Sequence, residues 1–139
     1  MAENVRLSAA VVFVRNLDRS VKFYTEVLGL AVVDRSPTAV LLGEADGDPQ
    51  LVLRAFGERA THPLGALGVQ YLLWMTGSRE DLDRRTALLQ QRSAYSETHT
   101  NGEAVTVEGR DPDDLVVMIG YRPPGQAAMR GLPARVYAW

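Results

Sequence analysis

The sequence predicts an α+β fold built from two similar halves, each with the order strand, helix, strand, strand, strand. This order occurs twice with a period of about fifty residues. One segment in each half has the apolar spacing of an amphipathic helix, and Gly- or Pro-containing turn signals separate the short β-branched runs. With 139 residues, the chain is long enough for one domain with its own core, or for two small modules that share one.

The first half begins with an apolar run over residues 9–14, which predicts a strand. Asn16 follows as a candidate N-cap, and Gly29 supplies a left-handed stop. Between these two residues, apolar side chains recur at helical spacing, at Leu17, Val21, Tyr24 and Leu28. The turn signals that follow delimit three further strands, at 30–33, 38–42 and 50–56.

The second half repeats this order, beginning with a strand over residues 69–75. Ser78 and Asp81 approximate a capping box at the start of a helix. The helix has an inward face of Leu82, Thr86 and Leu89 and a charged outer face of Arg79, Asp83 and Arg84. Strands follow at 95–99, 104–108 and 115–121, and Asn101-Gly102 predicts a hairpin turn between the first two.

Two segments lie outside the predicted modules. Residues 57–67, which contain His62 and several small residues, read as a linker between the halves. Residues 122–139 are rich in Pro, Gly and Ala but end in Tyr137 and Trp139, an aromatic composition unusual for a chain end. We expect this tail to dock, either as a lid on a binding site or against a partner subunit.

Composition excludes several classes of function. Fifteen basic residues against seventeen acidic ones give a net charge of −2, so there is no general electrostatic reason to bind nucleic acid or an anionic membrane. The absence of cysteine excludes disulfides, thiolate metal sites and a cysteine nucleophile. No segment has the length of a membrane span or the pattern of a signal peptide, so we expect a cytoplasmic protein.

Two motifs resemble a known family. The first runs from Ser20 through Phe23-Tyr24 to Leu28-Gly29, and the second is Asp111-Pro112-Asp113 before the last predicted strand. Both are similar to the vicinal oxygen chelate superfamily, which includes glyoxalase I, extradiol dioxygenases, fosfomycin-resistance enzymes and bleomycin-binding proteins. The resemblance covers 5–121 and implies a single domain of two paired βαβββ modules, at 5–56 and 68–121. It further implies that the eight strands form an open, cupped mixed sheet with the site inside the cup, and that the chain forms a homodimer.

The resemblance also implies positions for metal ligands, because enzymes of this superfamily hold a divalent ion with His or Glu from the first and last strands of each module. Here those positions fall on Ala9, on Tyr71 or the neighbouring Gln70, on Met118, and within 50–56, which contains no Asp, Glu or His. Alanine has no donor atom, and a thioether suits soft Cu(I) rather than a catalytic Fe(II) or Zn site. We therefore expect neither a metal nor another cofactor.

The remaining donors do not form a recognisable metal motif. His62 in the linker and His99 near a hairpin end are expected to be loop or surface residues. Glu97, Glu103 and Glu108 are expected to be solvated on an exposed hairpin. The alternative is a metalloenzyme of the lyase or dioxygenase type whose displaced metal site uses His62 or His99.

Strand alternation predicts an apolar lining for the cup. Aromatic, aliphatic and thioether groups favour a flat, apolar ligand, although the same side chains would also serve as ordinary core. We therefore expect metal-independent binding or sequestration of a small planar molecule, as in proteins of the bleomycin-resistance type. A non-catalytic structural dimer is a further alternative. The candidate ligand-binding residues are Phe13, Arg54, Tyr71, Leu73, Tyr95 and Met118.

Overall fold

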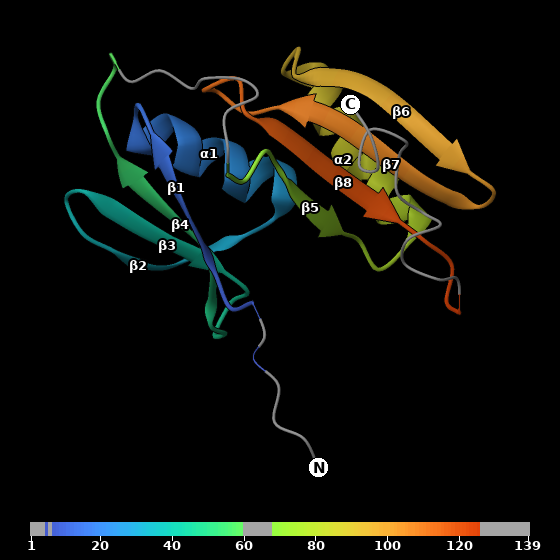
Figure 1. Cartoon of the computed structure of the whole chain (residues 1–139), viewed down its shortest axis with the longest axis horizontal. Coiled ribbons are helices and arrows are strands. Elements are labelled where there is room, and N and C mark those ends of the chain that lie inside the picture. Colours follow the sequence, from blue (N-terminus) through green and yellow to red (C-terminus); the bar gives the residue numbers. More distant parts are fainter. Residues whose placement is uncertain (1–4, 6, 60–67, 126–139) are drawn as a thin grey trace. The chain divides into compact units, whose positions relative to one another are not determined.

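The computed structural model describes residues 5, 7–59 and 68–125, which form two compact units. Unit 1 contains the described residues up to Arg59, and unit 2 contains residues 68–125. Each unit has one helix packed on one four-stranded mixed sheet (Figure 1). The predicted α+β class with two βαβββ modules is thus confirmed, with the eight strands hydrogen-bonded as two separate sheets of four.

Unit 1 has its first and last strands side by side. The strand order is β1-β4-β3-β2, with β1 parallel to β4 and the other neighbours antiparallel. The strand at Pro49–Ala55 is therefore central. The predicted turn signals, at 36–37 and 46–49, lie on either side of the strand at Ala39–Gly43, where the chain reverses direction between antiparallel strands. The elements are β1 (Ala10–Val14), α1 (Leu17–Leu28), β2 (Ala31–Arg35), β3 (Ala39–Gly43) and β4 (Pro49–Ala55).

The predicted helix of unit 1 is confirmed at both ends. The Asn16 side chain accepts a hydrogen bond from the Arg19 backbone N–H at 2.9 Å, which satisfies one of the free donors in the first turn. Gly29 ends the helix in the left-handed conformation, with φ of 73°. One face of α1 is buried and, with one face of the sheet, supplies the core of the unit, which includes Val14, Val21, Val27, Val40, Leu42, Leu51 and Leu53.

Unit 2 repeats this topology, with strand order β5-β8-β7-β6 and a parallel β5–β8 pair. β5 is shorter than the predicted strand at 69–75, because its pairing with β8 begins only at Leu72. Ser78 caps α2 as predicted, accepting from the Asp81 N–H at 3.0 Å. The elements are β5 (Leu72–Met75), α2 (Arg79–Gln91), β6 (Tyr95–Asn101), β7 (Ala104–Arg110) and β8 (Val116–Tyr121).

The surroundings of Gly109 on β7 show which face of the unit 2 sheet packs against α2. A Cβ built on Gly109 would lie 2.9 Å from Cδ2 of Leu89, so position 109 points toward α2. Side chains alternate along a strand, so Val107 shares this face while Thr106 and Glu108 lie on the opposite, helix-free face. The same alternation carries to β8, where Met118 lies opposite Glu108 and therefore on the helix-free face.

Asp111 organises the entry to β8. Its Oδ1 accepts hydrogen bonds from the backbone N–H groups of Asp113 and Leu115, at 2.8 and 2.9 Å. Asp114 then adopts a positive φ of 68°, a conformation that Asp tolerates better than most residues. The Asp-Pro-Asp motif is therefore a turn that the Asp111 side chain stabilises.

Some predictions lie partly or wholly outside the described residues. These are the linker from residue 60 to 67 with His62, and the tail from residue 126 to 139 with Trp139. Among the residues that the structure describes, neither helix is long and apolar enough to cross a membrane.

Candidate ligand-binding site

The positions where the family resemblance implies metal ligands do not fit a metal ion. Ala9 precedes β1 and offers no donor, and β4 contains no Asp, Glu or His. Met118 is fully buried in β8, where it lies opposite Leu73 in the parallel pair. Tyr71 comes just before β5, and a phenol must lose its proton before it can act as a strong ligand. We derive no chemistry from a metal at these positions.

Unit 1 instead presents an aromatic pair on its helix-free face. The rings of Phe13 and Phe56 stack with their centroids 4.9 Å apart and their planes 5° from parallel. Both rings are open to solvent, with 54% of Phe13 and 65% of Phe56 exposed. The Phe56 N–H donates to the Val14 carbonyl at 2.8 Å, so Phe56 continues the pairing of β4 with β1. We call these two rings the Phe13–Phe56 platform.

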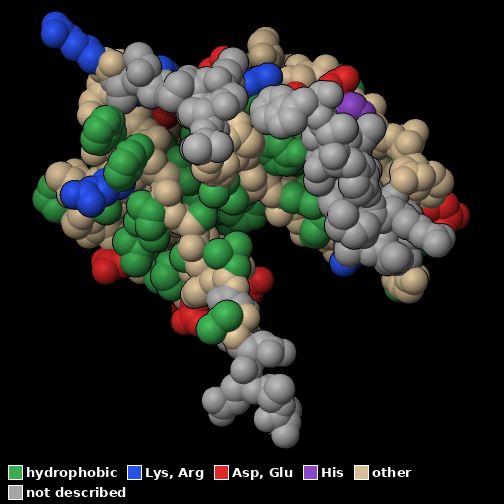
Figure 2. Space-filling view, viewed as in Figure 1, with side chains coloured by type: hydrophobic (Ala, Val, Ile, Leu, Met, Phe, Trp, Pro, Cys, Tyr) green, Lys and Arg blue, Asp and Glu red, His purple; other side chains and the backbone are tan. Residues whose placement is uncertain are grey.

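Arg54 lies beside this platform. It is directly opposite Phe13 in the parallel register of β1 and β4, and two residues before Phe56 on the same chain. Alternation places all three side chains on one face, and Arg54 is exposed there. In the space-filling view, hydrophobic side chains crowd the visible surface of unit 1 around a basic group (Figure 2). Of the predicted site residues, Phe13 and Arg54 are thus brought together.

Phe56 is a site residue that was not among those predicted from the sequence. The signal was present, because residues two apart on a strand share a face, and Phe56 is two residues after Arg54. Applying the same alternation to the predicted strand at 50–56 places Phe56 on the face of Arg54.

Four of the predicted residues belong to unit 2, and two of them, Leu73 and Met118, are paired. Leu73 and Met118 are opposite each other on β5 and β8, on the face that α2 does not cover. Leu73 is partly exposed and Met118 is fully buried, so only Leu73 offers surface to a ligand directly. Tyr71 lies two residues before Leu73, just ahead of β5, and is half-buried.

Tyr95 is placed on the other face of unit 2. Its strand partner is Gly109, the residue that points toward α2. The Tyr95 hydroxyl is hydrogen-bonded to Oγ1 of Thr98 at 2.7 Å, and Thr98 pairs with Val107, which is on the same face. The structure therefore does not bring Tyr95 together with Leu73 and Met118.

The expectation that Glu97, Glu103 and Glu108 are all solvated is wrong for Glu108. Only 3% of Glu108 is exposed, and its strand β7 lies between β6 and β8 in the sheet. His99, expected to be an ordinary surface residue, has a buried Nε2 that makes no hydrogen bond. Donor atoms of Glu97, His99 and Glu108 all lie within 4.8 Å of one another. Strand alternation predicts that residues two apart on β6 share one face of the sheet. It does not predict that Glu108 on β7 is buried.

The fold and the composition of these faces define a two-module βαβββ protein whose usual metal positions lack suitable donors. The chain belongs to the Glyoxalase/Bleomycin resistance protein/Dioxygenase superfamily, whose family model matches residues 6–119. No curated protein matches it significantly.

Solved structures share the fold at low sequence identity. A glyoxylase/bleomycin resistance protein/dioxygenase domain from Frankia sp. EAN1pec has a TM-score of 0.74 and 24% identity, covering 89% of this chain and 96% of that one. A lactoylglutathione lyase from Agrobacterium tumefaciens has a TM-score of 0.65 and 21% identity, covering 86% and 95%. Oxidase ChaP-H2 has a TM-score of 0.66 and 18% identity, covering 89% and 98%. At these identities the likeness establishes the fold alone.

Proposed function

We propose that this protein binds a small planar aromatic molecule, preferably an anionic one, without using the metal positions of its family. The observation that carries the proposal is the exposed Phe13–Phe56 platform with Arg54 beside it. Two large aromatic side chains that stack on each other and remain open to solvent form an apolar surface of the kind that marks ligand-binding sites. A flat ring extends such a stack, and a guanidinium pairs with a carboxylate.

Energetics set the scale of the interaction. Covering ~150 Å² of apolar ligand surface at ~25 cal/mol/Å² contributes about 4 kcal/mol before ordering costs, which corresponds to roughly millimolar affinity. Arg54 is exposed, so its ion pair with a ligand adds about 0–1 kcal/mol. A two-ring probe should therefore bind weakly but measurably, and a larger ligand that covers more surface should bind more tightly.

The proposal gives the other predicted residues different roles. In unit 2, Tyr71 and Leu73 remain predicted ligand contacts, whereas the fully buried Met118 supports Leu73 from the neighbouring strand. Tyr95 is left out because it lies on the face that packs toward α2. As the resemblance implies, we propose that the protein acts as a homodimer in the cytoplasm, in the manner of bleomycin-resistance proteins, which sequester a ligand.

The test is a calorimetric titration in the presence of EDTA with three matched probes. We expect saturable binding of 2-naphthoate, weaker binding of 2-naphthol, which is flat but has no carboxylate, and weaker binding of decahydro-2-naphthoate, which is charged but not flat. Replacing Phe13 or Phe56 with Leu should weaken binding of 2-naphthoate, because Leu keeps apolar area but loses the flat face. Val32→Ala, an exposed apolar residue on β2, is the control. Absence of saturable 2-naphthoate binding would refute the proposal.

A competing function is lyase or oxidase chemistry at a displaced metal site. The observation that favours it is the grouping of Glu97, His99 and Glu108, which offers the type of donor that the usual positions lack. Activity assays with and without added divalent metal separate the two functions. A turnover that requires metal would favour the enzyme, whereas ligand binding unchanged by EDTA supports the binding protein.

A further inference from the structure

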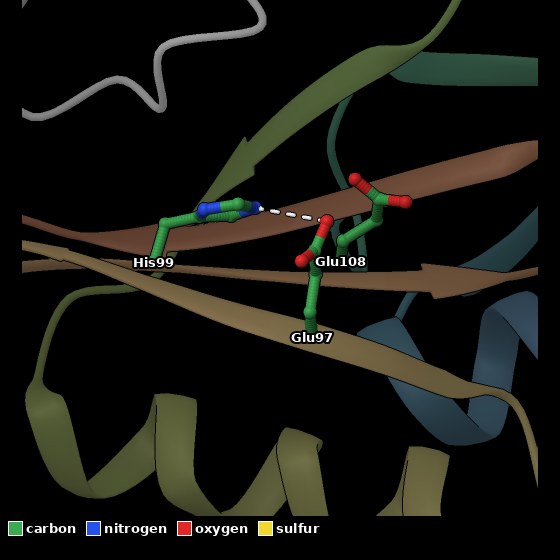
Figure 3. A group of neighbouring side chains, drawn as sticks. All are labelled: Glu97, His99 and Glu108. Carbon is green, nitrogen blue, oxygen red and sulfur yellow. Dashed lines mark ion pairs between the residues drawn. The ribbon is translucent and has the colours of Figure 1, made fainter.

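The hairpin of β6 and β7 brings three metal-ligating side chains to one place in unit 2. Glu97 and His99 are two residues apart on β6, and Glu108 lies directly opposite Glu97 on β7. All three side chains rise from the helix-free face of the sheet and converge (Figure 3). The distance from His99 Nε2 to Glu97 Oε1 is 3.3 Å, and one ligand atom of each residue lies within 4.8 Å of the others.

The charges in this group are arranged in a way that favours a cation between them. Like charges directly opposite on neighbouring strands destabilise a sheet, and Glu97 and Glu108 are such a pair. Glu108 is also almost completely buried, and a buried carboxylate needs compensating charge or hydrogen bonds. Arg110 on the same strand supplies compensating charge, with its Nη2 at 4.0 Å from Glu108 Oε2.

His99 provides a second, independent observation. Its Nε2 is inaccessible to solvent and makes no hydrogen bond, although a buried ring nitrogen normally has a partner. The nearest carboxylate oxygen, on Glu97, is at 3.3 Å, in a geometry that does not form a hydrogen bond. An ion held by Nε2 and by the carboxylates would satisfy this nitrogen.

The spacing of the donors fits a metal ion. Two ligand atoms that each lie about 2.1 Å from an ion are about 3.0–3.4 Å apart in octahedral or tetrahedral coordination. The His99–Glu97 separation of 3.3 Å already has this value. The donor atom of Glu108 lies within 4.8 Å of the other two and would move closer to them when an ion binds. Glu97 and His99 retain side-chain exposures of 56% and 32%, so part of this group lies at the surface.

We infer that Glu97, His99 and Glu108 form a binding site for a first-row divalent transition-metal ion. One imidazole and two carboxylates are the donors that Zn, Mn, Fe(II), Co and Ni accept, whereas Mg and Ca favour sites made of oxygen alone. Three protein donors leave further coordination positions open to water or to a small chelating molecule. The site lies on strands β6 and β7, rather than on the first and last strands of the module.

The inference is tested by adding metal to protein that carries no affinity tag and has been freed of metal with EDTA and desalted. Calorimetric titration with Zn²⁺ should show one ion bound per chain, and Co²⁺ should give a visible absorption spectrum typical of mixed nitrogen and oxygen ligands. Mg²⁺ should bind more weakly than Zn²⁺. Glu97→Gln and His99→Gln should each weaken Zn²⁺ binding about tenfold or more. These are the primary variants, because Glu108 is buried and its substitution also perturbs folding.

Two control variants should bind Zn²⁺ like the unchanged protein. Glu103→Gln removes the same charge from the turn of the same hairpin, and His62→Gln removes the second histidine of the chain. Lack of saturable Zn²⁺ binding overturns the inference, as does binding that His62→Gln abolishes and His99→Gln leaves unchanged. The 2-naphthoate titration is run in EDTA, so failure of the metal site and failure of the aromatic site are observed separately.

Discussion

Glu108 lies directly opposite Met118 across β7 and β8. Met118 occupies the position where the family resemblance implies a metal-binding glutamate. The carboxylate of Glu108 therefore lies on the strand next to that position. The thioether is fully buried and the carboxylate nearly so. The metal-ligating side chains of this sheet therefore lie on β6 and β7, whereas β8 has the apolar Met118 opposite Glu108.

Restoring the glutamate at position 118 should destabilise the protein. Met118→Glu places a second carboxylate directly opposite Glu108 in a buried position, and an uncompensated buried charge costs about 3–5 kcal/mol. The near-isosteric Met118→Leu should cost less than about 1.5 kcal/mol. Urea denaturation of both variants measures the difference. Equal stability of the two variants would contradict the burial of this pair.

Arg54 should contribute a salt-dependent part of aromatic acid binding. Arg54→Gln should weaken 2-naphthoate binding by up to about fivefold, the effect of an exposed ion pair. The binding of the unchanged protein should weaken toward that of the variant as salt is raised to about 1 M, where the Debye length falls to about 3 Å. Calorimetry at several salt concentrations checks this, with 2-naphthol as the uncharged control. A variant with unchanged affinity at low salt would remove Arg54 from the site.

The N-cap of α1 should contribute measurably to stability. Asn16→Ala removes the acceptor of the hydrogen bond from the Arg19 N–H and should lower the free energy of unfolding by about 1 kcal/mol. Asn16→Asp keeps an acceptor and adds a negative charge near the helix N-terminus, so it should be close to neutral. Denaturant titrations of both variants measure the change. A loss of the same size in Asn16→Asp would mean that the cap is not the cause.

Gly109 marks a close approach between β7 and the end of α2. A Cβ at this position would lie 2.7 Å from the Ala94 carbonyl oxygen and 2.9 Å from Leu89 Cδ2, so Gly109→Ala should destabilise the protein by about 1–3 kcal/mol. Gly77→Ala is the matched control, since a Cβ there meets nothing within 4 Å. Thermal unfolding compares the two. Greater destabilisation by Gly77→Ala than by Gly109→Ala would contradict this prediction.

Asp111 should be needed as a hydrogen-bond acceptor rather than for its charge. Asp111→Ala leaves the N–H groups of Asp113 and Leu115 without their acceptor, which should cost about 1–3 kcal/mol. Asp111→Asn retains an oxygen at the same place and should recover most of this loss. The free energy of unfolding of the two variants gives the comparison. An Asn variant as unstable as the Ala variant would show that the charge matters instead.

Local signals predicted the elements of this fold well. Asn16 and Gly29 fixed the limits of α1, and Ser78 fixed the start of α2, because caps are decided by the residues that form them. The predicted start of β5 was less accurate, because β5 begins only where it can pair with β8. Leu72 pairs with Val117, which lies much later in the sequence. The local pattern of apolar residues does not show which distant strand will pair with β5, or where that pairing starts.

For the candidate sites, too, local patterns were predicted correctly and long-range strand pairing was not. Phe13 was predicted from strand alternation and Arg54 as a candidate polar anchor. The stacking of Phe13 on Phe56 and the pairing of Phe13 with Arg54 depend on the register of β1 with β4. The acidic pair on the second hairpin was misjudged for a related reason. The predicted turn centred on Asn101-Gly102 would place Glu108 opposite Tyr95. The observed pairing of Asn101 with Ala104 moves the turn by one residue and brings Glu108 opposite Glu97.

The two proposed sites differ in how the folding chain assembles them. Glu97, His99 and Glu108 belong to one hairpin, whose ends meet over a short loop, and such contacts form on the microsecond timescale. Phe13 meets Arg54 only when β1 pairs with β4 across all the intervening elements of unit 1, and contacts of high sequence separation form slowly. During folding, the acidic hairpin should therefore exist before the aromatic surface does.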